Sequence, residues 1–125
     1  MRRKLISYHL VMMRQNGEMK LCEALESEIE IGFETVAQKY SLEYCSSRLY
    51  EDFIQIKFRA DQKSQLDKVI EEFKETMNEM ISNKTGTNCR FLLDRFCLVS
   101  REEVPVDIIE GFIGRKITEF VCNEG

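Results

Sequence analysis

The stretch EDFIQIKF, residues 51–58, decides how this chain folds, because its side chains alternate in character along an extended backbone. The purely apolar side chains fall on one face of the predicted strand and the mixed set on the other: Ile54, Ile56 and Phe58 against Phe53, Gln55 and Lys57. We therefore expect the even positions to be buried beneath helices, with the odd positions on the opposite face of a sheet.

Hydrophobic periodicity on either side of this strand predicts the other elements. Strands are expected at 4–14, 42–50, 53–59 and about 90–99, and helices at 18–40, after Asp61 and around Pro105. Asp61 is a plausible N-cap, Pro105 fits a first helical turn, and 82–88 is expected to be a loop. This order predicts an α+β fold, a ferredoxin-like antiparallel sheet with helices packed on one face.

Composition is that of a single globular domain spanning residues 1–125. No apolar run approaches the roughly 18 to 20 residues of a membrane-spanning helix, so we expect a cytoplasmic protein with no membrane partner. The five cysteines include no Cys-x-x-Cys pair, which predicts reduced thiols rather than a zinc site or a disulfide framework. The net charge of −4 means that any nucleic-acid binding needs positive charge concentrated on one face.

Three patches resemble the small HUH single-tyrosine transposases of insertion sequences, the family that includes the REP-associated tyrosine transposases. The patches are residues 8–11, 42–58 and 96–113, and the resemblance extends over roughly residues 5 to 117. The family strand reads Asp-His-hydrophobic-His, and its two histidines hold a divalent metal. Asp52 and Ile54 match this motif, whereas Phe53 and Gln55 stand at the histidine positions. Phenylalanine cannot ligate a metal and an amide is a poor substitute for imidazole, so we expect no metal and no cofactor.

The last predicted helix resembles the family's nucleophile helix, which reads Val-x-x-Tyr-Ile-x-x-Gln. Phe112 stands at the tyrosine position and Lys116 at the glutamine position. The resemblance implies DNA-strand transesterification through a phosphotyrosine, with the metal stabilising the phosphate charge. Because the nucleophile and both metal ligands are replaced, we expect no catalytic residue here and no enzymatic activity of this kind. Phe112 is expected to be core, and His9 a structural hydrogen-bonding group.

Three hypotheses follow from the resemblance. The preferred one is an inactive transposase-like homodimer, since family members pair through their sheets, that binds single-stranded or hairpin DNA or RNA without a covalent bond. The second is a dimeric protein-interaction scaffold with no nucleic-acid partner, which the acidic balance and the lost motifs favour. The third is an active transposase or nuclease with unconventional ligands.

Candidate nucleic-acid contacts are basic residues and the two altered motif positions: Arg2, Arg3, Lys4, Arg14, Arg48, Phe53, Gln55, Lys57 and Arg59. Lys57 and Arg59 share the face of Phe53 and Gln55, which predicts a small basic, aromatic and amide patch. Phe53 either fills the vacated metal pocket, stacks on a base or makes a dimer contact. The acidic pairs 71–72 and 102–103 are expected to lie on solvated surface.

Overall fold

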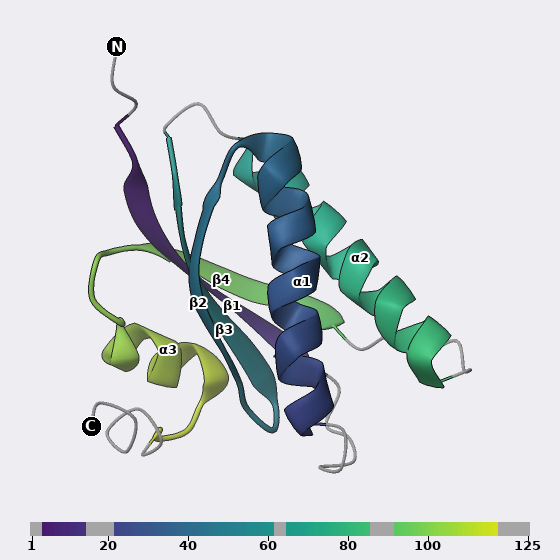
Figure 1. Ribbon diagram of the computed structural model, residues 1–125. Helices are drawn as coiled ribbons and strands as arrows, with labels where there is room; N and C mark the ends of the chain where they lie inside the picture. Colours follow the sequence, from purple (N-terminus) through teal and green to yellow (C-terminus); the bar gives the residue numbers. More distant parts are fainter. Residues whose placement is uncertain (1–3, 15–21, 62–64, 86–91, 118–125) are drawn as a thin grey trace.

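The computed structural model describes residues 4–14, 22–61, 65–85 and 92–117 (Figure 1). Its elements in chain order are β1 (Ile6–Arg14), α1 (Cys22–Tyr40), β2 (Glu43–Leu49), β3 (Phe53–Ala60), α2 (Leu66–Thr85), β4 (Leu92–Ser100) and α3 (Val106–Ile113). None of the helices in the described ranges is long and apolar enough to cross a membrane.

The four strands form one antiparallel sheet in the order β2-β3-β1-β4. β1 lies at the centre of the molecule, paired with β3 on one side and β4 on the other. The helices α1 and α2 make the long connections between strands, which places both of them on one face of the sheet (Figure 1). The predicted α+β class and antiparallel sheet are confirmed.

The main core lies between the sheet and the two long helices. Ile54, Ile56 and Phe58 of β3 are fully buried there, as the alternation predicts. Phe33 of α1 joins the layers, with its ring centroid 5.1 Å from Phe58 and 5.3 Å from Phe73 of α2. Aromatic rings at these separations add edge and stacking contacts to the burial of apolar surface.

The opposite face of the sheet is covered by α3, which departs from the expectation that the helices share one face (Figure 1). Ile109 of α3 packs with Val11 and Phe53 in a second core cluster, completed by Tyr50 and Ile117. The physical reason is that the odd positions of β1 and β3 carry apolar side chains at this end of the sheet. Removing these apolar side chains from water requires a second packed layer on this face of the sheet, and α3 supplies it.

Three predicted boundaries differ from the structure. α2 begins at Leu66, so Asp61 is not its N-cap, and it continues to Thr85, beyond the expected start of a loop at residue 82. Pro105 directly precedes α3 rather than lying in its first turn. α3 ends where Gly114 adopts a left-handed conformation (φ 80°), and the Gly114 N–H donates to the Glu110 carbonyl at 2.8 Å. Phe120, expected on the last helix, lies outside the described residues.

We expect Phe33→Ala to lower the free energy of unfolding by about 3 to 5 kcal/mol, because it leaves a cavity where three rings meet. The neighbouring Ile31 is 55% exposed and serves as the matched control. Ile31→Ala should change stability little. Urea unfolding followed by circular dichroism measures both, and comparable losses in the two variants would contradict this description of the core.

Candidate functional site

The two altered motif positions lie on the α3 face of β3, and both side chains are buried. The Phe53 ring stacks on the Tyr50 ring, with centroids 4.2 Å apart and planes inclined by 10°. The Arg115 guanidinium, just beyond the end of α3, lies 5.6 Å from the Phe53 ring centroid. Phe53 is thus packed inside the second core cluster. This geometry fits the alternative in which the ring fills the vacated pocket, and it leaves no open ring face for a nucleobase.

Gln55 is held by the single histidine of the chain. The Gln55 Nε2 amide donates to His9 Nδ1 at 2.9 Å, which requires the proton on the other ring nitrogen. That nitrogen, Nε2, lies 3.4 Å from the Glu102 carbonyl oxygen. Burial lowers the pKa of His9 below its usual value, which keeps the ring neutral. His9 therefore acts here as the structural hydrogen-bonding group that its sequence context predicts.

The residues present do not fit the divalent metal that the resemblance implies. Phe53 has no donor atom, and the Gln55 amide is engaged by His9. The adjacent Asp52 accepts two hydrogen bonds from Arg115, from Nη2 at 2.8 Å and from Nε at 3.1 Å. Hydrogen bonding to Arg115 is the main cause that lowers the pKa of Asp52. Across the ranges that the structure describes, no three His, Cys, Asp or Glu side chains converge on a possible metal position.

The nucleophile position lies on α3, at the edge of the second core cluster. Phe112 is half-buried against this cluster, which agrees with its expected role as core. The Arg95 guanidinium lies 4.7 Å from the Phe112 ring centroid and donates to the Phe112 carbonyl at 2.7 Å. Lys116 is exposed, with its Nζ 3.7 Å from Glu110 Oε1. A phenyl ring and a cation therefore occupy the two positions that the resemblance assigns to the tyrosine and the glutamine.

The structure brings together three of the predicted basic contacts. Arg48 of β2 lies directly opposite Gln55, on the same face as Lys57 and Arg59 of β3. Arg48 makes no ion pair with any residue in the described part of the chain. We call Arg48, Lys57 and Arg59 the basic row. The predicted patch is therefore divided, since its basic part borders solvent whereas Phe53 and Gln55 are buried.

The remaining predicted contacts lie elsewhere. Lys4 is exposed just before β1. Arg14 is buried at the other end of that strand, where its Nη1 donates to the Tyr50 carbonyl at 3.0 Å. It therefore belongs to the interior rather than to a binding surface. Arg2 and Arg3 lie outside the described residues.

Glu102, in the loop between β4 and α3, is exposed as predicted, and its contacts with the basic row make it a functional candidate as well. Its Oε1 accepts from Lys57 Nζ at 3.0 Å and from Arg59 Nη2 at 3.2 Å, and its Oε2 accepts from Ser7 Oγ. Arg59 also forms an ion pair with Glu43 at 3.0 Å. Hydrogen bonds from Ser7, Lys57 and Arg59, in that order, lower the pKa of Glu102 to about 2. No local sequence signal points to the contacts of Glu102, because they join residues 43 or more positions apart.

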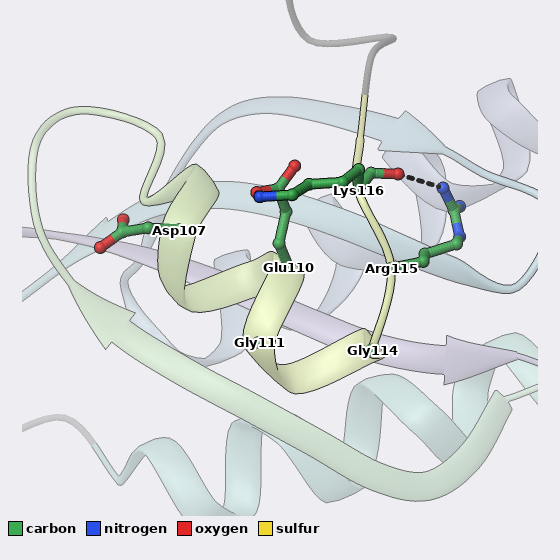
Figure 2. Close-up of a pocket in the computed structure, with 6 residues that line it drawn as sticks. All are labelled: Asp107, Glu110, Gly111, Gly114, Arg115 and Lys116. Carbon is green, nitrogen blue, oxygen red and sulfur yellow. Dashed lines mark hydrogen bonds and ion pairs between the residues drawn. The ribbon is translucent and has the colours of Figure 1, made fainter.

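A hollow of about 520 Å³ at the C-terminal end of α3 offers a second candidate site (Figure 2). It is lined by Asp107, Glu110, Gly111, Gly114, Arg115 and Lys116. Its polar groups already form hydrogen bonds within the protein. Glu110 Oε2 accepts from the Ile117 N–H at 2.7 Å, and Arg115 Nη1 donates to the Lys116 carbonyl at 3.2 Å. These contacts hold the segment after α3 in place and define no ligand chemistry.

Acid titration tests the contacts of Glu102. Because the pKa of Glu102 is about 2 in the folded protein and ordinarily 4.5, its contribution to stability is complete above pH 4.5 and is lost as the pH falls toward 2. We expect the stability of Glu102→Gln to fall less over this interval than that of the unmodified protein. Glu103→Gln, altered at the exposed neighbouring position, should follow the unmodified protein. Urea unfolding across the pH series checks this, and parallel curves for all three proteins would contradict it.

Solved structures with a similar fold are transposases. A candidate transposase from Deinococcus radiodurans R1 superposes with a TM-score of 0.74 at 11% identity, over 91% of this chain and 94% of that one. A REP-associated tyrosine transposase bound to a REP hairpin superposes with a TM-score of 0.58 at 10% identity, over 90% of this chain and 67% of that one. Identities this low establish a shared fold.

The family is assigned from the sequence rather than from the fold. No curated protein sequence matches it. The profile of the family described as IS200-like transposases matches residues 2–116, nearly the whole chain. Together with the antiparallel sheet and the position of α3, this match shows that the chain belongs to the IS200-like transposase family.

Proposed function

We propose that residues 1–125 form a single, catalytically inactive transposase domain that binds a structured single strand, a DNA or RNA hairpin, without a covalent bond. The observation that carries the proposal is the contrast between two neighbouring parts of the α3 face. The motif positions Phe53 and Gln55 are closed by packing, whereas the basic row beside them borders solvent. Such a surface retains phosphate contacts without the reacting groups.

Loss of the nucleophile supports inactivity. Phosphotyrosine chemistry requires a hydroxyl on α3, and Phe112 has none. Tyr50 packs on Phe53, and Tyr40 and Tyr44 lie against the main core on the other face of the sheet. Tyr8 likewise packs against that core, stacked on Phe58 with ring centroids 5.6 Å apart. None of these tyrosines lies on α3, so none can stand in for Phe112.

The distribution of charge supports nucleic-acid binding despite the net charge of −4. Exposed glutamates cluster on the two long helices: Glu26, Glu30 and Glu34 on α1, and Glu71, Glu75 and Glu79 on α2. The basic row lies on the opposite face of the sheet. A protein charged in this way orients its positive face toward a polyanion. The related transposase bound to a REP hairpin provides a precedent for the ligand class.

We include homodimerisation in the proposal. β2 and β4 are the edge strands of the sheet, and both edge ladders are interrupted: the register shifts between Tyr44 and Ser46 of β2, and between Met12 and Arg14 of β1 where it pairs with β4. Irregularities of this kind discourage edge-to-edge pairing. β4 carries the exposed Phe96 at its edge, which makes β4 the better candidate for pairing with a second copy.

One observation favours the rival function, a dimeric protein-interaction scaffold. Glu102 and Glu43 pair with two of the three cations in the basic row, so the charge open to a phosphate backbone is smaller than the sequence predicts. A scaffold of this kind would show no salt-dependent binding of nucleic acid. The binding experiment below therefore distinguishes the two functions.

Arg48→Gln should weaken binding of a hairpin oligonucleotide about threefold to tenfold and reduce the salt slope by about 0.7, because one phosphate contact is lost. Lys68→Gln is the matched control, since Lys68 is exposed on α2, on the other side of the sheet. Fluorescence anisotropy over a salt series measures both quantities. Absence of salt-dependent binding by the unmodified protein would favour the scaffold, and equal losses in the two variants would remove the basic row from the interface.

Incubation with single-stranded hairpin DNA and manganese should leave no covalent protein–DNA adduct on a denaturing gel. Phe112→Tyr alone should not restore the adduct, because the phosphate charge would still lack a metal to stabilise it. Phe112→Leu controls for altered packing at this position. An adduct formed by the unmodified protein would overturn the inactive assignment and favour an active nuclease with unconventional ligands.

A further inference from the structure

The carboxylate of Glu102 is held as an oxyanion ligand would be held. Two cations and one hydroxyl donate to its two oxygens: Lys57 and Arg59 to Oε1, and Ser7 to Oε2. Charge-assisted donors of this kind also bind the non-bridging oxygens of a phosphodiester. The arrangement therefore has the chemistry of a phosphate site whose ligand is a side chain of the same protein.

The donors are fixed by the centre of the sheet. Ser7 of β1 lies directly opposite Arg59 of β3, and Lys57 lies two residues along on the same face. Arg59 Nε also donates to Ser7 Oγ at 3.3 Å, which orients the hydroxyl. β1 and β3 are the two inner strands of the sheet. Their pairing fixes the spacing of these side chains independently of the conformation of the loop after β4.

The position of the Glu102 carboxylate allows a ligand to displace it from these donors. Its side chain is 63% exposed, whereas Lys57 and Arg59 are 22% and 36% exposed beneath it. The loop is tied to the sheet by the Arg101 N–H, which donates to the Ser7 carbonyl at 3.0 Å. Movement of the carboxylate alone breaks no contact of either core cluster. Solvent-exposed ion pairs are weak and screened by salt, so a ligand with several phosphates competes well with one carboxylate.

We propose that Ser7, Lys57 and Arg59 form a binding site for a phosphate of the nucleic-acid backbone, and that Glu102 occupies this site as an internal phosphate mimic that must be displaced for binding. The inference rests on the proposed function and adds a regulatory contact to it. In the resting protein only Arg48 of the basic row is open to a phosphate. Displacement of Glu102 adds Lys57 and the Nη2 group of Arg59, while Arg59 Nη1 stays paired with Glu43.

The test removes the internal ligand and leaves the donors in place. Glu102→Gln should raise affinity for a hairpin oligonucleotide about fivefold and steepen the salt slope by about 0.7, the value for one further phosphate contact on a single strand. Glu103→Gln, which removes the same charge one residue away, is the matched control and should change both quantities much less. Adding Arg59→Gln to Glu102→Gln should abolish most of the gain. Anisotropy titrations of the four proteins at several salt concentrations give these values.

Inorganic pyrophosphate separates this inference from the proposed function. In thermal melts at matched ionic strength, pyrophosphate should raise the Tm of Glu102→Gln more than that of Glu103→Gln or the unmodified protein. Hairpin binding that appears only in Glu102→Gln, together with this shift, would support the site and refute binding by the resting protein. A Glu102→Gln variant that folds but gains neither hairpin affinity nor a pyrophosphate shift would overturn the inference and leave Glu102 a structural contact. Equal binding of polyglutamate and hairpin by Glu102→Gln would also overturn it, in favour of an acidic protein partner.

Discussion

The antiparallel pairing of β1 with β3 sets which side chains face α1 and α2 and which face α3. Leu10 lies opposite Ile56 toward the long helices, and Val11 lies opposite Gln55 toward α3. A slip of one residue would exchange the two sets, exposing the main core and burying Lys57. Both faces of the central strands carry a layer of packed side chains, so this register is specified from two sides. This register also sets the relative positions of the candidate-site residues on β1 and β3.

The same register explains why the positions expected to match metal ligands, Phe53 and Gln55, are closed by packing. Two ligands projecting from alternate positions of one strand hold a metal only if the pocket above them stays open to the substrate. Here Phe53 stacks on Tyr50, Arg115 holds Asp52, and Ile109 of α3 closes the cluster from above. The replacement is a consistent set of apolar and ion-pair contacts rather than an empty pocket. Such packing stabilises α3 against its own sheet.

The exposed surface of the protein is characterised by an uneven distribution of charge. Positive charge follows adjacent positions of β2 and β3, and negative charge covers the outer surface of the two long helices. Two carboxylates also lie on the positive face: Glu102 pairs with Lys57 and Arg59, and Glu43 pairs with Arg59. These two carboxylates limit how much of the basic row is available, which explains why net charge alone describes this protein poorly.

The sequence by itself determined the order of elements, the two faces of β3 and the family. These properties are local, because side-chain alternation and short motifs are contained within one segment. Tertiary structure alone decided that α3 covers the second face, that Arg14 is buried, that Gln55 pairs with His9, and that Glu102 holds Lys57 and Arg59. Each of these contacts joins residues that lie more than 30 positions apart, so it depends on strand order and register. No local pattern of residues encodes that information.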